Sequence, residues 1–218
     1  MIKNLGVIFD MDGVIIDSNP FHKIALNQFC GQHGKFLSEE DLLKKVYGRT
    51  NKEWITNLFG DIGEEKLRAY AAEKEALFRE LYKNDIVPVK GLVKFLQQLD
   101  HHKIARSIGT SAPRANVDFT LSSTHLEKYF EIILDDTFVN LGKPNPEIYI
   151  KSIKALELPP GRCIVIEDSL SGIQAGKAAG AKVIGITTTH TAAEMPETDL
   201  VIDDFESLTV EMLEELVS

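Results

Sequence analysis

The chain has 218 residues, of which 44% are hydrophobic and 26% are charged, and its net charge is -9. A chain of this length and composition can bury a core without disulfides or structural metals, which excludes a disordered, fibrous or disulfide-framework protein. The acidity is concentrated at the C-terminal end, since residues 183–218 hold nine acidic side chains and no Lys or Arg, while the rest holds 24 residues of each sign. Without a basic stripe, we expect no nucleic-acid partner.

The two cysteines, Cys30 and Cys163, form no CxxC pair, which argues against a zinc or thiol redox motif and fits a reducing compartment. No apolar stretch reaches the roughly 18 residues of a membrane-spanning helix, and no cleavage site follows the first residues. We therefore expect a cytoplasmic protein without a membrane partner. The sequence leaves the oligomeric state open, and we expect a monomer.

The first predicted element is a buried strand at residues 5–9, a continuous apolar run that stops at Asp10 and an Asp12-Gly13 turn. The stretch from Asp17 to Asp85 then reads as helical throughout. Further strands are predicted at 104–108, 132–134, 163–166 and 183–186, and further helices at 92–99, 116–121, 147–156 and 173–179. Segments 201–204 and 208–216 complete the core.

This order predicts an α/β fold with a parallel sheet that carries helices on both faces. The helical block between the first strand and the others is best interpreted as an inserted second domain. We expect the α/β domain to comprise residues 1–16 and 87–218, and the all-helical domain to comprise residues 17–86.

The pair Asp10 and Asp12 follows the first predicted strand. Alternation along an extended chain puts both carboxylates on one side, where they would repel unless they share a proton or a cation. One could act as a nucleophile while the other transfers protons. Taken alone, the motif could also be a turn that merely ends a strand.

Polar residues also follow the other predicted strands: Thr110 and Ser111, Lys143 in a turn-rich segment, and Glu167 and Asp168. A parallel sheet brings such residues to one edge. Carboxylates, an ammonium and a hydroxyl together suit a hard divalent cation and a phosphoryl group, and oxygen-only ligands favour Mg²⁺ over zinc.

Four segments in order, Phe9 to Ser18, Ile108 to Ser111, Gly142 to Tyr149 and Val165 to Gly172, resemble the four motifs of the haloacid dehalogenase-like superfamily. The group resembled is that of β-phosphoglucomutases and sugar-phosphate phosphatases with a helical cap after the first motif. The resemblance covers nearly the whole chain and implies a Rossmann-like core with an inserted cap domain.

By that resemblance, Asp10 would attack phosphorus to form an aspartyl phosphate, and Asp12 would protonate the leaving oxygen and then activate water or an incoming hydroxyl. An acid at Asp12 and a metal site argue against dehalogenation, since halide leaves without protonation, and family members that cleave phosphonates lack this acid. The implied phosphate-binding residues are Thr110, Ser111 and Lys143. The implied Mg²⁺ ligands are Asp10, Glu167, Asp168 and the backbone carbonyl of Asp12.

In the cap and hinge, the candidates for substrate binding are His22, Arg49 and Lys74. The alternatives are a structural histidine, a solvated loop and a solvated helix face, respectively. The mutases of the resembled group carry a pattern similar to Lys-Gly-x-Ser-Arg in the cap loop. This chain has Asn51 at the position of their arginine. That departure favours hydrolysis.

We therefore expect a Mg²⁺-dependent phosphatase that acts on a small phosphorylated metabolite, a sugar phosphate, through an aspartyl phosphate. The alternative is a β-phosphoglucomutase-like phosphosugar mutase, and a remote one is a phospho-accepting regulatory domain. The natural substrate and the role of the acidic C-terminal region do not follow from the sequence.

Overall fold

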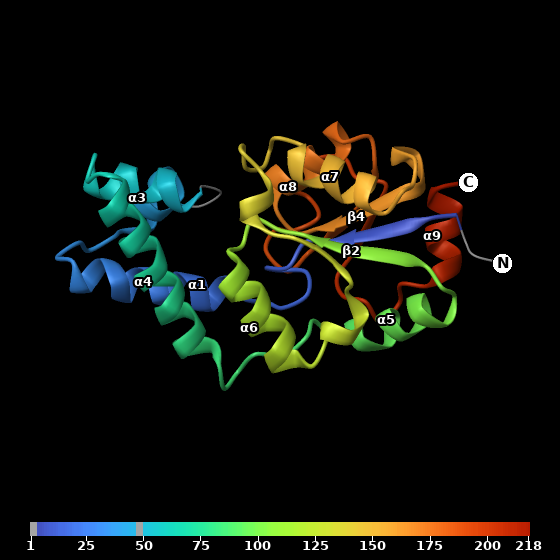
Figure 1. The fold of residues 1–218 in the computed structure, drawn as a ribbon, viewed down its shortest axis with the longest axis horizontal. Coiled ribbons are helices and arrows are strands. Elements are labelled where there is room, and N and C mark those ends of the chain that lie inside the picture. Colours follow the sequence, from blue (N-terminus) through green and yellow to red (C-terminus); the bar gives the residue numbers. More distant parts are fainter. Residues whose placement is uncertain (1–3, 47–49) are drawn as a thin grey trace. The chain divides into compact units, whose positions relative to one another are not determined.

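The computed structural model describes residues 4–46 and 50–218. The chain divides into two compact units (Figure 1): the core unit, Met1–Asp17 with Ile86–Ser218, and the helical unit, Ser18–Asp85. Each unit is described separately below. In the described parts of the chain, no helix combines the length and apolar character needed to cross a membrane.

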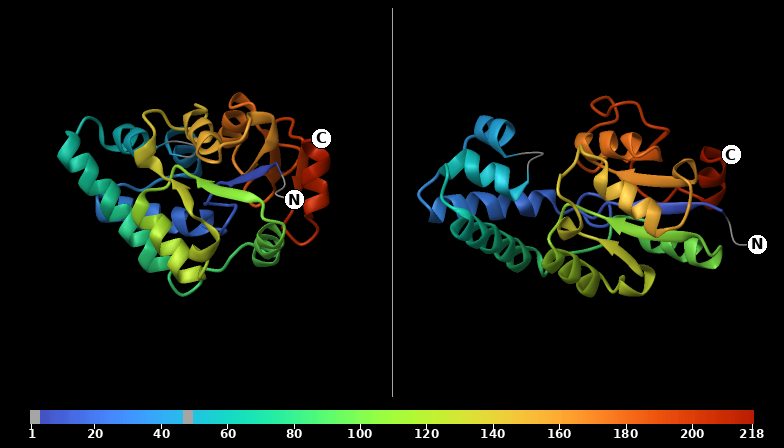
Figure 2. Two further views of the ribbon diagram at one scale, coloured as in Figure 1. Left: turned by 45° about the vertical axis from the view of Figure 1, so that its right-hand side comes forward. Right: turned by 45° about the horizontal axis from the view of Figure 1, so that its top comes forward.

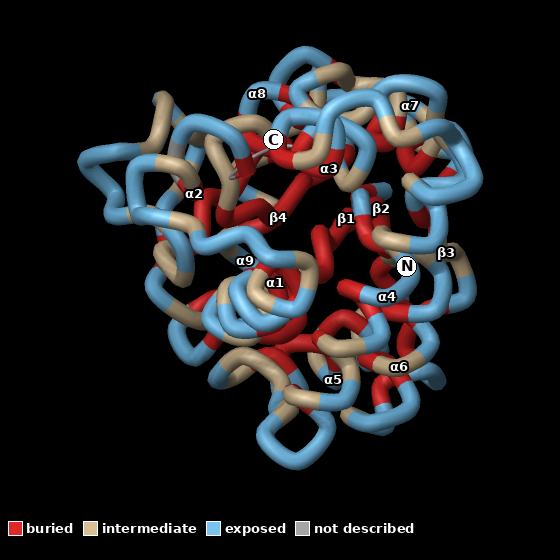
Figure 3. Tube along the Cα trace, turned by 90° about the vertical axis from the view of Figure 1, so that its left-hand side faces the viewer, coloured by how far each residue is buried: buried red, intermediate tan, exposed pale blue. Residues whose placement is uncertain are grey.

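The core unit is built on a six-stranded sheet in the order β3-β2-β1-β4-β5-β6, and every neighbouring pair is parallel. The strands are β1 Gly6–Phe9, β2 Ala105–Gly109, β3 Ile132–Leu134, β4 Cys163–Glu167, β5 Lys182–Ile186 and β6 Leu200–Ile202. Every residue of β1 and β4 is buried (Figure 3), as continuous apolar runs require of strands covered on both faces. The strand order reverses on either side of β1, so ligand sites are expected beyond the carboxyl ends of β1 and its neighbours.

Helices cover both faces of this sheet, which confirms the predicted fold class. They are α5 Leu92–His101, α6 Arg114–Thr124, α7 Glu147–Ala155, α8 Leu170–Ala178 and α9 Val210–Leu216. Helices α7 and α8 lie on one face and α5 and α6 on the other (Figures 1 and 2).

Two apolar clusters hold β1 in place just before Asp10. The Phe9 ring packs against Phe95, Phe130 and Phe205, with centroid distances of 6.3, 5.6 and 6.2 Å. Ile8 belongs to a cluster that includes Tyr149 and lies fully buried. Because aromatic and aliphatic packing fixes the end of β1, the position of the residue that follows it is also fixed.

The helical unit consists of α1 Asn19–Gln32, α2 Glu39–Lys45, α3 Asn51–Phe59 and α4 Glu64–Tyr82. Capping boxes begin two of these helices, with Ser38 and Asp41 at α2 and Thr50 and Glu53 at α3. Phe29 lies at the centre of the apolar core of this unit, where its ring contacts Trp54 edge-on at 5.8 Å.

Candidate active site

The parallel register brings three polar segments to one edge of the sheet. Phe9 lies opposite Ile108 in β2 and opposite Ile166 in β4, so the residues that follow these positions leave the sheet at one level. The backbone N–H of Asp10 continues the pairing and donates to the Ile166 carbonyl at 3.1 Å. Asp10 therefore lies beside the end of β4, which carries Glu167 and Asp168.

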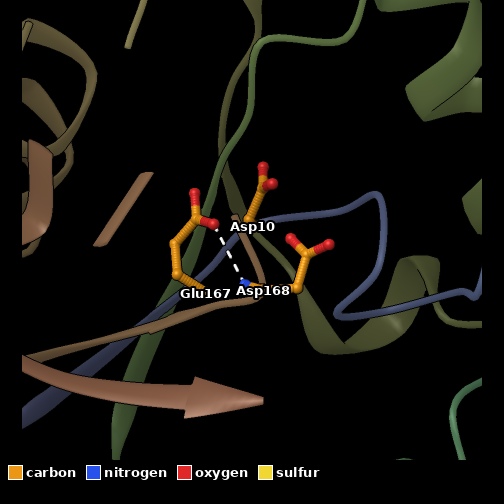
Figure 4. Close-up of side chains that lie close together, drawn as sticks. All are labelled: Asp10, Glu167 and Asp168. Atoms are coloured by element: carbon orange, nitrogen blue, oxygen red, sulfur yellow. Dashed lines mark hydrogen bonds between the residues drawn. The ribbon is translucent and has the colours of Figure 1, made fainter. Parts of the chain in front are cut away.

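Asp10, Glu167 and Asp168 form a buried acidic cluster. Each contributes a carboxylate oxygen, and these oxygens all lie within 4.8 Å of one another. The three residues are only 7%, 0% and 3% exposed, respectively. Figure 4 shows the three carboxylates projecting to the same side from the ends of the two strands.

Lys143 approaches this cluster from the segment before α7. Its Nζ lies 3.0 Å from Asp10 Oδ1 and 2.6 Å from Glu167 Oε1, and its side chain is 6% exposed. The ammonium also lies 4.8 Å from the centroid of the Tyr149 ring, whose hydroxyl donates to Glu167 Oε1 at 2.6 Å. Lys143 is thus fixed between two carboxylates and an aromatic face.

Glu167 is anchored by its other oxygen at the start of α8. Oε2 accepts from the backbone N–H of Asp168 (Figure 4) and of Ser169, both at 3.0 Å, and from the Ser169 hydroxyl at 2.9 Å. Ser169 also caps α8 by accepting from the Gly172 N–H. A Cβ on Gly172 would lie 1.7 Å from Glu167 Oε1, so only glycine leaves room for this carboxylate.

The Asp168 carboxylate is also fixed by a hydrogen bond and by close packing against a glycine. The Thr189 hydroxyl donates to its Oδ2. Gly13, at φ +75°, packs so close that a Cβ would lie 2.0 Å from the same oxygen. The left-handed conformation and this contact both require glycine at position 13.

Burial and mutual repulsion shift the pKa values of the cluster in different directions. Burial, with the charges of Glu167 and Asp12, raises the pKa of Asp10 to about 7 even though Lys143 opposes the shift. Burial and the charges of Glu167 and Asp10 raise the pKa of Asp168 well above its ordinary value. The pKa of Glu167 is lowered despite burial, because Lys143, Tyr149 and Ser169 stabilise its charged form. Burial alone would lower the pKa of Lys143, but Asp10 and Glu167 raise it, so the ammonium stays charged.

The donor set fits a hard divalent cation. Three buried carboxylates face one ammonium, so the ionised cluster carries excess negative charge. Among the described residues, Asp10 Oδ1 is a buried oxygen that accepts no well-aligned hydrogen bond. Oxygen-only ligands of this kind suit Mg²⁺, as the sequence predicts.

The remaining residues predicted at the core site differ in their surroundings. Asp12 is partly exposed, and its charge contributes to the raised pKa of Asp10. The chain turns at Met11, whose carbonyl accepts from Val14, Ile15 and Ile16, so strand alternation does not continue to Asp12. Thr110 is buried, with its hydroxyl accepting from the Ala112 N–H at 3.1 Å, whereas Ser111 is exposed.

Within the helical unit, the candidates His22 and Lys74 contact each other. Lys74 Nζ donates to His22 Nδ1 at 2.8 Å and to Glu75 Oε1 at 3.0 Å. Lys74 is 7% exposed, so the alternative of a solvated helix face is wrong. His22 stacks on Phe78 with a centroid distance of 3.7 Å. Arg49 lies outside the described residues.

Asn51 also belongs to this network. Its Nδ2 donates to Glu75 Oε1 at 3.2 Å, and its Oδ1 accepts from Trp54 Nε1 at 2.8 Å. Glu75 therefore accepts from both Asn51 and Lys74 and balances the lysine charge.

The sequence predicts no role for three residues that support the cluster, Tyr149, Ser169 and Thr189, although the first two lie in the motif segments 142–149 and 165–172. Each contacts Glu167 or Asp168 by a hydrogen bond, and the bonds of Tyr149 and Thr189 span 18 and 21 residues. A usable pattern exists for Thr189, because polar residues follow β5 as they follow β1, β2 and β4.

Comparisons with known proteins agree with this geometry. A family model described as haloacid dehalogenase-like hydrolase matches residues 7–186. A phosphorylated carbohydrates phosphatase from Thermotoga maritima is 33% identical over 180 residues, covering 80% of this chain and 81% of that protein. A beta-phosphoglucomutase from Bacillus subtilis is 29% identical over 220 residues, covering 96% and 94%. The crystal structure of a family IA, variant 3 HAD hydrolase from Entamoeba histolytica is 34% identical with a TM-score of 0.90, covering 98% of this chain and 99% of that one. The resemblance to enzymes of the phosphatase and phosphosugar mutase group is confirmed, and the chain belongs to the haloacid dehalogenase-like hydrolase family.

Proposed function

We propose that this protein is a Mg²⁺-dependent phosphatase that hydrolyses a small phosphorylated metabolite, a sugar phosphate, through an aspartyl phosphate on Asp10. The observation that carries the proposal is the buried ammonium of Lys143 between Asp10 and Glu167, at 3.0 and 2.6 Å. Phosphoryl transfer needs mainly positioning and neutralisation of charge on the phosphoryl oxygens, and a nucleophile beside a fixed cation supplies both. Similarity to a phosphorylated carbohydrates phosphatase supports the substrate class.

The first step forms a bond between an Asp10 carboxylate oxygen and phosphorus. The bond from phosphorus to the substrate's alcohol oxygen breaks, and Asp12 gives that oxygen its proton. In the second step Asp12 takes a proton from water, the water oxygen bonds to phosphorus, and the bond to Asp10 breaks. Partial exposure of Asp12 is compatible with contact with both the leaving group and water.

Lys143, Thr110 and Ser111 would bind the phosphoryl oxygens. Asp10, Glu167, Asp168 and the backbone carbonyl of Asp12 would hold Mg²⁺, which when bound neutralises charge on the transferring group. Glu167 also keeps Lys143 in place, since one of its oxygens accepts from that ammonium.

We further propose that the two units are a catalytic core domain, residues 1–16 and 87–218, and a cap domain, residues 17–86. The cap residues His22, Arg49 and Lys74 would bind the non-reacting part of the substrate. The protein would act as a cytoplasmic monomer on a small molecule, without a nucleic-acid or membrane partner. The family match argues against a phospho-accepting regulatory domain.

The second candidate is a phosphosugar mutase, which similarity to a beta-phosphoglucomutase favours. A mutase must hold a second phosphate group strongly enough to keep water from the aspartyl phosphate. In this chain Asn51 is neutral and bonded within the helical unit, and Glu75 balances the charge of Lys74. Less positive charge is therefore available for a second phosphate, which supports hydrolysis.

The test of the phosphatase is inorganic phosphate release from a panel of sugar, polyol and nucleotide monophosphates with Mg²⁺. Asp10→Asn should abolish turnover with an unchanged circular dichroism spectrum, and Asp12→Asn should reduce it by about 10²- to 10⁴-fold. Turnover by Asp10→Asn within tenfold of the wild type would contradict the assignment of the nucleophile.

The test against the mutase uses the same preparation. Conversion of β-glucose 1-phosphate to glucose 6-phosphate, primed with the 1,6-bisphosphate, is compared with phosphate release. Isomerisation that exceeds phosphate release by more than about a hundredfold would make the mutase the correct function.

A further inference from the structure

Three consecutive threonines follow β5, and each hydroxyl donates to a different segment of the core unit. Thr187 Oγ1 donates to Asp203 Oδ1 at 2.7 Å, beyond the end of β6. Thr188 Oγ1 donates to the Gly13 carbonyl at 2.5 Å, and Thr189 Oγ1 donates to Asp168 Oδ2. The last two bonds reach the two segments that carry the acidic cluster.

The contact with Thr189 fixes one oxygen of Asp168. The same Oδ2 lies against Gly13, where a Cβ would be 2.0 Å away, so the carboxylate is confined between the Gly13 backbone and the Thr189 hydroxyl. Rotation of the carboxylate would break this hydrogen bond or press the oxygen into the Gly13 backbone. Threonine suits the role because its branched side chain is stiff at χ1, so the hydroxyl direction is largely set by the backbone.

The neighbouring threonine, Thr188, holds the backbone of Gly13, against which the Asp168 carboxylate packs. The bond from Thr188 to the Gly13 carbonyl spans 175 residues of sequence and connects the end of β5 to the turn after Asp10. The segment Thr188–Thr189 therefore sets the spacing between the Asp10 turn and the Asp168 carboxylate.

We propose that Thr189 is a positioning residue, whose hydroxyl orients the Asp168 carboxylate as a ligand for the divalent cation. The proposal rests on the proposed metal-dependent function and adds a residue to it that lies outside the acidic cluster. Partners of metal-ligating carboxylates typically change metal affinity by about 10- to 100-fold when they are removed. Loss of the Thr189 hydroxyl should act through metal affinity, because Thr189 reaches the site through Asp168.

The test compares Thr189→Val, which removes the hydroxyl and keeps the shape, with Thr189→Ser, which keeps the hydroxyl. Thr187→Val is the matched control, since its hydroxyl bonds to Asp203. Thr189 is exposed, so these variants should fold, and Thr189→Ala serves as a second deletion of the hydroxyl. The dissociation constant of Mg²⁺ is measured by calorimetry on the chelator-treated full chain, and thermal melting without metal checks the fold.

Thr189→Val and Thr189→Ala should raise the Mg²⁺ dissociation constant by about 10- to 100-fold, in line with other partners of metal-ligating residues. The Mg²⁺ dissociation constant of Thr189→Ser should stay within about threefold of the wild-type value, and that of Thr187→Val within about twofold, because both keep the hydroxyl that contacts Asp168. The Mg²⁺ concentration for half-maximal phosphate release should shift in parallel.

A Thr189→Val protein that binds Mg²⁺ within twofold of the wild type would overturn the proposal, as would a Thr189→Ser protein as impaired as Thr189→Val. In either case a wild type that binds Mg²⁺ and releases phosphate leaves the proposed function standing. A wild type that neither binds Mg²⁺ nor needs it for phosphate release would overturn both.

Discussion

Substitution of Gly172 by alanine tests the packing of Glu167 directly. The added Cβ would lie 1.7 Å from Glu167 Oε1 and 1.9 Å from its carboxyl carbon, so the carboxylate must move. Glu167 is fully buried and accepts hydrogen bonds from Lys143, Tyr149, the Asp168 N–H and both donors of Ser169. No displacement of the carboxylate can preserve all of these bonds.

The expected loss of stability is that of a buried charge, here Glu167, that loses its partners. Such a loss lowers the free energy of unfolding by about 3–5 kcal/mol. For a chain of this size, each kcal/mol shifts the melting temperature by roughly 2–4 °C, so we expect a decrease of about 6–20 °C. Turnover should fall by at least about 10²-fold, because Lys143 loses the carboxylate that orients it.

The assays are thermal melting by circular dichroism and phosphate release on the substrate that the wild type prefers. The matched control is Gly31→Ala in α1, where no atom lies within 4 Å of the added Cβ. Alanine should stabilise that helix by up to about 1 kcal/mol. A Gly172→Ala protein with the melting temperature and turnover of the wild type would refute the reasoning.

Three further predictions concern the charges of the site. The pKa of Asp10 is raised from 3.8 to about 7, so the folded state holds a proton that the unfolded chain loses, and stability falls as pH rises through this range. In urea titrations with EDTA, the unfolding free energy of the wild type should therefore decrease between about pH 5 and 8 by roughly 3 kcal/mol more than that of Asp10→Asn. Identical pH dependence in the two proteins would contradict the raised pKa. Lys143→Ala should lower kcat for phosphate release by about 10²-fold or more, while Lys151→Ala, a control whose partly exposed side chain pairs with Glu147, should change it less than about twofold. If the two variants have equal kcat values for phosphate release, the role of Lys143 is purely structural. EDTA should abolish phosphate release and Mg²⁺ restore it, with Ca²⁺ a poor substitute because of its looser coordination. Full activity after exhaustive chelation would exclude a metal-dependent step.

The α/β class could be predicted because β1 and β4 are fully buried and therefore read as continuous apolar runs, and shorter apolar runs mark the other strands. The predicted strand at 163–166 corresponds to β4, which extends one residue further to Glu167. The sequence predicts that the helix after this strand begins at 173, three residues after the true start of α8 at Leu170. Residues 167–172 carry active-site groups and a helix cap at once, so their polar character hides the first turn of the helix.

The candidate site could be predicted as far as strand ends determine it. Asp10, Glu167 and Asp168 follow paired parallel strands and meet at one edge. The support from Tyr149 depends on tertiary packing between α7 and β4, which no local pattern encodes. The pattern of polar residues after β5 could point to Thr189, but only the packing of that segment shows which carboxylate it contacts. The burial of Lys74 likewise depends on how α1 and α4 pack, since its sequence neighbours are charged.

The sheet order has a consequence for synthesis on the ribosome. Strand β1 emerges early, yet its neighbours β2 and β4 are Ala105–Gly109 and Cys163–Glu167, and Phe205 completes the packing around Phe9. The helical unit is continuous from Ser18 to Asp85, so its last residue precedes the start of β2 by 20 residues and the start of β4 by 78. A nascent chain that stops between residues 110 and 162 therefore contains α1 to α4 of that unit, while one edge of β1 still lacks its partner strand and is open to pairing with other chains.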